Sequence, residues 1–333
     1  MIELIFTVDY EILGNGRGSL RELVYEPADK LKTLFDKYGA HFVTFVEAAE
    51  LEMIEAERAD QAIDLVKQQI CDFHKQGFET GLHIHPQWYN GRYAHYEWLL
   101  DYEEYNLCTL HRARIAQIVE RSIDYLRKLL GAPNFTPIAF RAGNWLLQPA
   151  EDVAVVLVEH GIKVDSSVYK GGLQHHYKLD YRRALKNGYY WPFSEDVNIP
   201  DLRGRLVEIP TYTNMVPMWK LLSRKRIGLR QKGVAMDRIQ KKRHSRLRDF
   251  MRLWQPMKLD YCRLTIKQLT RMLDKEIQKD KIRPEVFRPI IAIGHTKDLN
   301  DLVTVDAFLA YLKRNQIRIS TFGDVYGKCN QRA

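Results

Sequence analysis

The sequence predicts an α/β fold with a mostly parallel β-sheet, and three observations lead to this prediction. Short apolar runs alternate with longer amphipathic stretches along most of the 333 residues, the β-α-β-α order that places parallel strands in one open or barrel-shaped sheet. Polar residues follow several of the apolar runs, where the active sites of such folds collect. The content of 45% hydrophobic and 28% charged residues is that of an ordinary globular chain.

The expected strands are short apolar runs, and the first of them begins almost at the N-terminus. In chain order they cover residues 4–8, 41–46, 78–83, 138–141, 163–165, 205–209, 289–293 and 318–320. The stretches between them have the apolar spacing of helices. These expected helices cover residues 26–38, 59–76, 109–130, 149–160, 265–279 and 304–315. Pro149 and Asp152 are typical of a helix N-terminus, and Gly161 follows the end of that helix.

The composition disfavours several classes of protein. No apolar run approaches the roughly 20 residues that span a bilayer. The N-terminus has neither the basic start nor the long apolar core of a signal peptide. The four cysteines are widely spaced and form no CxxC pair, which argues against a zinc ribbon and against a disulfide framework. We therefore expect a reduced, cytoplasmic protein.

The positive charge is concentrated in one segment. Residues 220–252 contain thirteen Lys and Arg against two acidic residues, a local charge of +11, so the rest of the chain carries −2 of the net +9. We expect residues 215–256 to form a basic, amphipathic and helical insertion in a single domain of residues 1–333. Six apolar residues of this insertion fall largely on one helical face. They are Met236, Ile239, Leu247, Phe250, Met251 and Trp254.

The insertion has more than one interpretation. It is either a solvated insertion, or a helix that binds an anionic partner. That partner would be a membrane surface at the inner face of the inner membrane, contacted through residues 220–252, or the pyrophosphate of a lipid-linked or nucleotide-linked sugar. Nucleic-acid binding is disfavoured, because no recognised nucleic-acid-binding module accompanies the charge.

Two pairs of metal-capable side chains stand at the ends of two expected strands. Asp9 and Glu11 follow the first strand, and His83 and His85 end the third. Residues i and i+2 of an extended strand point to the same face, so each pair faces one way. If the strands are neighbours, two imidazoles and a carboxylate hold a divalent metal, and the second carboxylate is left as a base. Each pair taken alone also has a structural interpretation, such as a solvated turn.

Three further polar residues stand at strand ends in the same way. Arg141 ends one expected strand, Asp165 ends another, and His295 follows the strand at 289–293. Each of these residues, taken singly, also has a structural interpretation. Arg141 is then an ion-pair partner, Asp165 a turn residue and His295 a buried histidine. Their occurrence together at several strand ends favours a catalytic site.

Five segments in this order resemble the motifs of the NodB-homology family, the polysaccharide deacetylases of carbohydrate esterase family four. The segments are Thr7-Val8-Asp9-Tyr10-Glu11, Gly81-Leu82-His83-Ile84-His85-Pro86, Phe140-Arg141-Ala142-Gly143-Asn144-Trp145, Val164-Asp165-Ser166-Ser167 and Ile291-Ala292-Ile293-Gly294-His295-Thr296-Lys297. The likeness covers nearly the whole chain apart from the basic insertion. The second and fifth motifs look most like the lipopolysaccharide-biosynthesis branch of the family, the WalW/WbmS-like proteins.

The resemblance implies a NodB-type distorted (β/α)7 barrel and a metal site. Glu11, His83 and His85 would hold the metal, with Asp9 as a further candidate ligand. Two motifs depart from the family pattern, because the metal carboxylate is shifted to Glu11 and the histidine motif is shorter. Zinc is the expected ion, and Mn²⁺, Co²⁺ or Fe²⁺ would fit the same ligands.

The resemblance also implies catalytic and substrate-binding roles. Asp9 would be the general base, oriented by Arg141, and His295 the general acid, oriented by Asp165. Residues beside or within the motifs are assigned to substrate binding, although Tyr89 and Tyr169 fit the core better than a sugar platform, and Trp88 and Trp145 fit both equally well. The assigned residues are Trp88, Tyr89, Asn144, Trp145, Tyr169 and Lys297.

The expected function is metal-dependent N-deacylation, either deacetylation or deformylation, of a nucleotide- or lipid-linked amino sugar during surface-polysaccharide assembly, in O-antigen or lipopolysaccharide biosynthesis. Three alternatives stay open. The chain would instead be a metal-free C–N hydrolase resembling allantoinases, or a non-catalytic sugar-binding protein. A non-haem iron oxygenase also uses two histidines and a carboxylate, but the alternating helices disfavour the all-β scaffold usual for that class.

Overall fold

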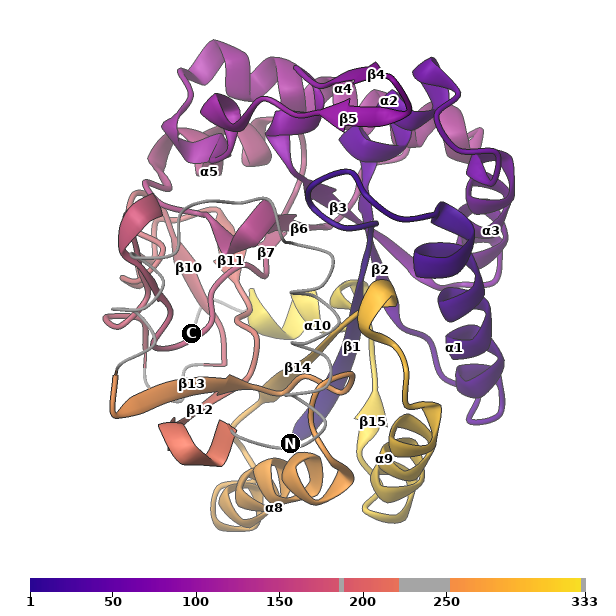
Figure 1. The fold of residues 1–333 in the computed structure, drawn as a ribbon. Coiled ribbons are helices and arrows are strands. Elements are labelled where there is room, and N and C mark those ends of the chain that lie inside the picture. The colour runs from indigo at the N-terminus through magenta and orange to yellow at the C-terminus, as the bar shows by residue number, and fades with distance from the viewer. Residues whose placement is uncertain (186–188, 222–251, 331–333) are drawn as a thin grey trace.

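The computed structural model describes residues 1–185, 189–221 and 252–330. Most of the predicted basic insertion, residues 222–251, lies outside the described residues, and so does the apolar helical face predicted there, apart from Trp254. Figure 1 shows strands at the centre of the molecule and helices around them.

The central sheet has the strand order β10-β11-β7-β6-β3-β2-β1-β14, and a short strand, β15, also pairs with β1. Its strands are β1 Ile2–Tyr10, β2 Val43–Glu47, β3 Glu79–Ile84, β6 Ala139–Ala142, β7 Val164–Asp165, β10 Trp191–Phe193, β11 Leu206–Glu208, β14 Arg288–His295 and β15 Arg318–Ile319. Neighbours are parallel from β11 to β14 in that order, and β10 pairs antiparallel with β11. All the strands predicted from the sequence are present, and only β10 of this sheet was not predicted.

The sheet curls until its two sides meet. Thr211, which follows β11, forms parallel bridges with Tyr169 after β7 and with Ile291 of β14. Asp260 forms a further parallel bridge with Ile293 of β14. These contacts close the sheet into a distorted (β/α) barrel, which confirms the predicted fold class.

Helices surround the barrel in Figure 1. They are α1 Glu26–Asp36, α2 Ala48–Glu57, α3 Ile63–Lys75, α4 Arg112–Leu130, α5 Glu151–Glu159, α8 Ile266–Ile282 and α9 Leu302–Arg314, whereas α10 Phe322–Cys329 is seen at the centre of the view. A π-helical turn, Arg21–Tyr25, precedes α1, and short 3₁₀ turns lie at Pro86–Trp88, Tyr102–Glu104, Leu107–Thr109, Gly143–Trp145, His175–Tyr177, Met218–Leu221 and Thr296–Asp298. Of the α-helices, α2 and α10 were not predicted. Within the described residues, no helix is long and apolar enough to cross a membrane.

Two hydrophobic clusters lie on the two sides of the sheet. The larger one packs the sheet against the outer helices and includes Leu4, Phe6 and Val8. The smaller cluster fills the barrel interior with residues from several strands and from α10. It consists of Ile5, Val43, Phe45, Ala139, Val164, Val207, Ile209, Ile291, Phe322, Val325 and Cys329. Helix α10 therefore packs into the interior cluster.

Three two-stranded ribbons project from the barrel. They are β4 Arg92–Ala94 with β5 Glu97–Leu99, β8 Leu173–Gln174 with β9 Leu179–Asp180, and β12 Thr213–Pro217 with β13 Trp254–Lys258. In the third ribbon Met215 pairs with Pro256. The prediction of a helical insertion from 215 to 256 is thus wrong at both ends, because extended backbone pairs there across the two sides of the insertion.

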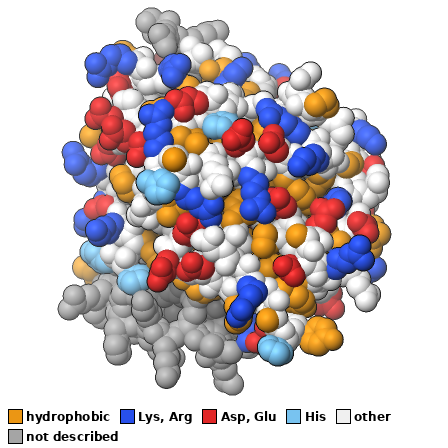
Figure 2. Space-filling model, turned by 90° about the horizontal axis from the view of Figure 1, so that it is seen from above, with side chains coloured by type: hydrophobic (Ala, Val, Ile, Leu, Met, Phe, Trp, Pro, Cys, Tyr) orange, Lys and Arg blue, Asp and Glu red, His pale blue; other side chains and the backbone are white. Residues whose placement is uncertain are grey.

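The surface of the described residues carries charges of both signs. Figure 2 shows acidic and basic side chains interspersed over one face of the molecule. This distribution agrees with the small net charge of the chain outside residues 220–252.

Candidate functional site

Alternation along the strands points a set of polar side chains into the barrel at one level. Ile5 of β1 belongs to the interior cluster, so Asp9, four residues on, points to the same side at the C-terminal end of the strand. In the parallel registers Asp9 lies opposite His295, and His83 lies between Glu47 and Arg141. These five residues all lie at the carboxyl ends of neighbouring strands, where barrel active sites collect.

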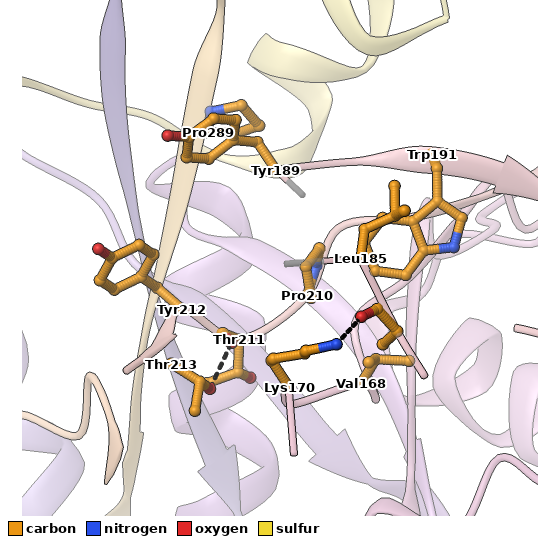
Figure 3. A pocket seen from close by; sticks show the side chains of 11 residues that line it. Val168, Lys170, Leu185, Tyr189, Trp191, Pro210, Thr211, Tyr212, Thr213 and Pro289 are labelled. Atoms are coloured by element: carbon orange, nitrogen blue, oxygen red, sulfur yellow. Dashed lines mark hydrogen bonds between the residues drawn. The ribbon is translucent and has the colours of Figure 1, made fainter. Parts of the chain in front are cut away.

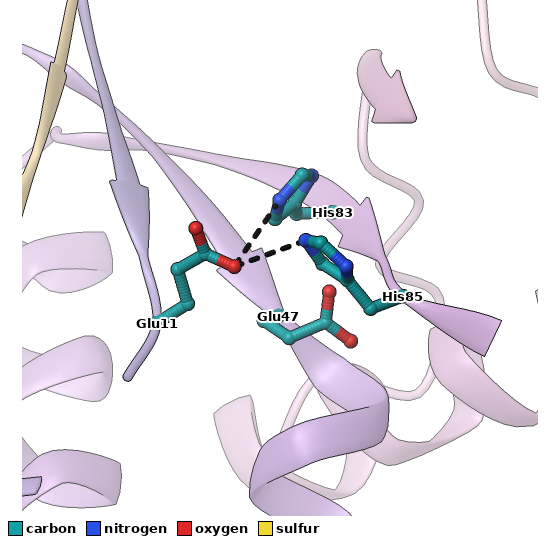
Figure 4. Close-up of side chains that lie close together, drawn as sticks. All are labelled: Glu11, Glu47, His83 and His85. Atoms are coloured by element: carbon teal, nitrogen blue, oxygen red, sulfur yellow. Dashed lines mark ion pairs between the residues drawn. The ribbon is translucent and has the colours of Figure 1, made fainter. Parts of the chain in front are cut away.

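Four of the buried side chains come together as candidate metal ligands (Figure 4). Glu11, Glu47, His83 and His85 each offer one ligand atom, and these atoms lie within 4.8 Å of one another. Glu11 Oε2 lies 3.1 Å from His85 Nε2 and 3.6 Å from His83 Nε2. The structure thus brings together the three predicted ligands, Glu11, His83 and His85, and adds Glu47, which the sequence reasoning missed.

The hydrogen bonds of the two histidines fit metal ligation through Nε2. His83 Nδ1 lies 2.8 Å from the carbonyl oxygen of Arg141, which only accepts, so Nδ1 carries the proton and donates it. Nε2 of His83 is then the ring nitrogen that faces Glu11. His85 Nδ1 lies 3.3 Å from the side-chain amide of Gln87, whose Oε1 has no hydrogen-bond partner among the described residues. Asn144 Nδ2 also lies 3.1 Å from this Nδ1, so turning both amides over lets their oxygens accept from His85 Nδ1–H, which frees His85 Nε2 in the same way.

Glu47 is the carboxylate of the cluster that is short of positive charge. Burial raises the pKa of Glu47 above its ordinary value, and the neighbouring imidazoles offset this only in part. Glu47 Oε2 is buried and has no hydrogen-bond partner in the described part of the chain. A divalent cation at the centre of the cluster would satisfy that oxygen, and two imidazoles with carboxylates are a donor set for Zn²⁺, Mn²⁺, Co²⁺ or Fe²⁺. The residues present therefore fit a metal.

Lys297 is placed differently from its predicted role in substrate binding. Its ammonium group lies 2.7 Å from Glu11 Oε1 and donates to the carbonyl of Ile12 at 2.9 Å. Burial raises the pKa of Glu11, but Lys297 and the two histidines outweigh that effect and hold it well below its ordinary value. Lys297 is thus bound to a candidate metal ligand instead of facing a substrate.

Asp9 lies between a cation and an imidazole. Arg141 Nη1 donates to Asp9 Oδ1 at 2.6 Å, and His295 Nε2 lies 3.3 Å from Asp9 Oδ2. Burial raises the pKa of Asp9, but Arg141, with His295 and His83, overcomes it and lowers the pKa below its ordinary value. Arg141 is itself fully buried and also donates to the carbonyl and hydroxyl oxygens of Ser166. The predicted contact between Arg141 and Asp9 is therefore present.

Asp165 does not take its predicted place beside His295. Val164 belongs to the interior cluster, so Asp165, the next residue on β7, points to the opposite side of the sheet. There it accepts hydrogen bonds from the backbone N–H and the hydroxyl of Ser167, at 3.0 and 2.7 Å. The carboxylate nearest to His295 Nδ1 is that of Asp298, at 3.9 Å, and Arg263 holds it at 2.8 Å. The prediction that Asp165 orients His295 is wrong: Asp298 is the carboxylate beside Nδ1, and Nδ1 makes no hydrogen bond among the described residues.

Two predicted substrate-binding aromatic residues belong to the core. Trp88 is completely buried and packs edge-to-face on Trp98, with 5.0 Å between ring centroids. Tyr89 is 8% exposed, and its hydroxyl shares a hydrogen bond of 2.9 Å with Ser122 of α4. Neither ring can stack on a sugar without breaking its contact with the β4–β5 ribbon or with α4. Their assignment to substrate binding is therefore wrong.

The other predicted substrate-binding residues lie beside the site. Asn144 Nδ2 lies 3.1 Å from His85 Nδ1. Trp145 is half-buried, lies 5.3 Å from the Arg141 guanidinium and contacts Tyr169 edge-on at 5.5 Å. Asn144 and Trp145 adopt left-handed backbone conformations, with φ of 55° and 68°, which are strained for residues with a side chain. The turn after β6 thus holds these two side chains next to Arg141 and His85.

A separate pocket opens on another part of the barrel wall (Figure 3). Its lining includes Lys170, Tyr189, Trp191 and Tyr212. The Lys170 ammonium donates to the carbonyls of Arg182 and Ala184. None of the residues that the sequence assigned to the site lines this pocket, so it is not the centre built by Asp9, Glu11 and the histidines.

Comparisons with known proteins agree on the fold. No protein-family model matches the sequence, and no curated protein matches it. A protein assigned as a polysaccharide deacetylase from Mycobacterium smegmatis superposes with a TM-score of 0.53 and 13% identity, over 98% of this chain and 90% of that one. A second such protein, from Pseudomonas aeruginosa PAO1, gives 0.52 and 13% over 97% and 89%. An allantoinase gives 0.51 and 13% over 97% and 88%.

At these identities the likeness establishes the fold alone. The barrel is that of the polysaccharide deacetylases, as the resemblance of the motifs predicted. The lipopolysaccharide-biosynthesis branch stays a prediction, as do the roles of the site residues.

Proposed function

We propose that this protein is a metal-dependent N-deacylase of an amino sugar that acts in the biosynthesis of lipopolysaccharide, O-antigen or another surface polysaccharide. One observation carries the proposal. The buried cluster of Glu11, His83 and His85 lies beside Asp9 and His295 at the carboxyl ends of barrel strands, in a fold that polysaccharide deacetylases share. Such a set combines metal ligands, a base and an acid in one place.

Glu11, Glu47, His83 and His85 would hold the metal. When bound, a divalent ion of this kind polarises an amide carbonyl and lowers the pKa of bound water to about 7. The two histidines would bind through Nε2, because their Nδ1 atoms are engaged by Arg141 and Gln87. Zinc is the ion that we propose, and Mn²⁺, Co²⁺ or Fe²⁺ suits the same donors.

Asp9 and His295 would move the proton that amide hydrolysis requires. Asp9 takes a proton from the attacking water, and Arg141 keeps the carboxylate ionised and aimed through its 2.6 Å contact. The proton on Asp9 then lies 3.3 Å from His295 Nε2. Burial lowers the pKa of His295 against the pull of Asp9 and Asp298, so its ring rests neutral and can take up that proton. It passes the proton to the amide nitrogen as the C–N bond breaks, which yields a free amine and a carboxylic acid.

A metal-free C–N hydrolase is a second candidate, and one contact favours it. Lys297 already neutralises Glu11 at 2.7 Å, so the cluster is partly compensated without a metal. The similar fold of an allantoinase is compatible with this alternative. A sugar-binding protein would bind N-acyl sugars without turnover, and a non-haem iron oxygenase would consume O₂ with 2-oxoglutarate.

Metal content and hydrolysis together test the proposal. Mass spectrometry should find about one equivalent of metal in the purified protein and less in both His83→Ala and His85→Ala. Release of acetate or formate should then be measured over a panel of N-acyl amino sugars, with Asp9→Asn as the inactive control. A protein that stays empty after incubation with zinc, manganese or iron, yet hydrolyses an amide, supports the metal-free alternative. Metal without hydrolysis of any N-acyl sugar contradicts the proposed reaction.

We propose further that the protein is cytoplasmic and contacts the inner face of the inner membrane through residues 220–252, where its nucleotide- or lipid-linked substrate is made. The basic composition of that segment supports this, and three large apolar side chains stand exposed where the β12–β13 ribbon meets it. Trp219 is 64% exposed, Leu253 76% and Trp254 56%. Amphipathic basic segments with exposed aromatic residues bind anionic interfaces.

Flotation with liposomes tests the membrane contact. The full chain should float with vesicles that contain anionic lipid and should remain at the bottom with neutral ones. A variant that lacks residues 220–252 should lose this difference. Equal partitioning of the two chains would contradict the contact.

A further inference from the structure

Lys258 is a cation beside the candidate site that neither the sequence reasoning nor the proposed mechanism uses. It is the last residue of β13 and pairs with Thr213 of β12. The next residues bind β14, because Leu259 accepts a hydrogen bond from Ile293 N–H at 2.9 Å. The residue after Lys258 is thus hydrogen-bonded to β14 at Ile293, two residues before His295, the last residue of that strand.

The Lys258 ammonium group lies on aromatic rings of the site. Its Nζ is 3.8 Å from the centroid of the Trp145 ring and 4.7 Å from that of Tyr169. The guanidinium of Arg141 lies 5.3 Å from the same Trp145 ring. Lys258 and the Arg141 group that holds Asp9 therefore share the Trp145 ring as a neighbour.

Within the described part of the chain, Lys258 differs from the other cations around the site in having no acidic partner. Arg141 is bonded to Asp9, Lys297 to Glu11 and Arg263 to Asp298. Among the described residues the Lys258 ammonium group makes no hydrogen bond or ion pair, and it lies against the two rings. Burial lowers its pKa to about 7, and the positive charges of Arg263 and Arg141 add to this against Asp260 and Asp9. No acidic group among the described residues pairs with the Lys258 ammonium group to balance its positive charge.

A cation held against aromatic rings without a counter-ion is suited to an anionic ligand. Its N–H groups are free for charge-assisted hydrogen bonds, which are stronger than neutral ones. The aromatic side chains of Trp145 and Tyr169 offer a surface for a sugar ring next to it. A ligand that reaches both residues would place its acyl group at Asp9 and its anionic group at Lys258.

We propose that Lys258 forms an anion subsite, which binds a phosphate or carboxylate group carried by the N-acyl amino-sugar substrate. This inference rests on the proposed function for the identity of the substrate, but not for the binding of the anion itself. It selects amino sugars with a linked phosphate or an acid group over neutral ones. A phosphate would come from a nucleotide or lipid carrier, and a carboxylate would come from the sugar itself.

Calorimetric titration of the purified protein with inorganic phosphate, and separately with acetate, tests the subsite without any need for hydrolysis. The wild type should bind one of the two anions, and Lys258→Met should weaken that binding by about 10–100-fold, the range for a hydrogen bond between charged groups. Lys258→Arg should retain most of the affinity. Lys163→Met is the matched control, because Lys163 also lies on an aromatic ring, that of Tyr326 at 5.4 Å, just before β7 begins. It should bind as the wild type does.

The two anions distinguish the two chemical sources, since tighter binding of phosphate favours a phosphate-linked substrate and tighter binding of acetate a sugar acid. Equal affinities in the wild type and Lys258→Met, or no binding of either anion by the wild type, overturn the subsite. Lys258 has no acidic partner to lose among the residues that the structure describes, so circular dichroism should show Lys258→Met folded. If anions bind through Lys258 but no N-acyl sugar is hydrolysed, the proposed reaction fails and the subsite stands. If hydrolysis occurs but anion binding does not depend on Lys258, only the subsite fails.

Discussion

Glu47→Gln should have opposite effects on metal binding and on the stability of the metal-free protein. The Glu47 side chain is completely buried, and its Oε2 has no partner among the described residues. Its other oxygen accepts from the Glu50 N–H at 3.4 Å and caps α2, a bond that the glutamine oxygen can keep. The substitution therefore removes the charge and leaves the shape.

The magnitude follows from the missing partner. An unsatisfied buried polar group costs about 1–3 kcal/mol, and more when it is charged. Burial raises the pKa of Glu47, so exchanging its ionised carboxylate for a neutral amide removes a cost of about this size in the metal-free protein. Unfolding entropy of about 2 cal/mol/K per residue converts this into a rise in Tm of about 1–4 °C for the metal-free variant at pH 8. Metal affinity should fall by more than the ~10–100-fold that the loss of an outer-shell partner causes.

Glu50→Gln is the matched control. Glu50 is an equally buried neighbour with a pKa raised well above its ordinary value by burial, and its Oε2 also has no partner in the described residues. It lies outside the set of candidate ligands, and its Oε1 accepts from the Ile12 N–H at 2.8 Å. This variant should gain stability in the same way and retain its metal affinity.

Competition of zinc or manganese between the protein and a chelator measures the affinity, and thermal unfolding after treatment with EDTA measures the stability. A Glu47→Gln protein that binds metal within twofold of the wild type would show that Glu47 is not a ligand. Equal loss of affinity in Glu47→Gln and Glu50→Gln would show a general effect of charge, and a lower Tm for metal-free Glu47→Gln would refute the cost assigned to the unpaired oxygen.

Three other substitutions test neighbouring parts of the structure. Asp298→Asn removes the carboxylate next to His295 Nδ1, so kcat should fall with KM unchanged. The fall in kcat should be smaller than the ~10²–10⁴-fold contribution of the general acid itself, and a change in KM alone in steady-state kinetics would contradict that role. Trp88→Phe should leave kcat and KM unchanged, because this ring is fully buried and touches core residues, whereas a large rise in KM would restore Trp88 as a substrate platform. Burial raises the pKa of Glu79 from 4.5 to about 7 in the folded protein. The contribution of Glu79 to the free energy of unfolding is therefore complete below the unfolded pKa near 4.5 and is lost as the pH rises through 7. Denaturant unfolding at pH 5 and pH 8 should therefore show a loss of up to about 3 kcal/mol in the wild type that Glu79→Gln lacks, and parallel curves would contradict the shift.

The sequence predicted the barrel and much of the site for the same physical reason. Buried parallel strands are short apolar runs, and polar residues at their ends stand out against them. Asp9 and His295 were found in this way, and the parallel register brings them side by side. Glu47 has the same signal, a charged residue after an apolar run, but the predicted strand ended at residue 46, and strand boundaries are the least certain part of such predictions.

Other errors came from contacts that a single segment does not contain. The side on which Asp165 points depends on whether Val164 or Asp165 faces the barrel interior, and both are buried. Trp88 stands next to the histidine motif in the sequence, but only the packing of the β4–β5 ribbon shows that it is enclosed. The strands around 215 and 256 are far apart along the chain, and the basic composition between them suggested a helix instead.

The β12–β13 ribbon has a consequence for how this protein can diverge. Its outermost pair, Pro217 and Trp254, brings the two ends of the intervening segment together. The entropy of closing a loop rises only slowly with its length, so what lies beyond that pair can grow, shrink or be exchanged at little cost to the barrel. The inner pair, Thr213 and Lys258, is joined to the strands that carry the site and has no such freedom. Descendants of this gene could therefore carry a different segment between Pro217 and Trp254 while the chemistry within the barrel stays unchanged.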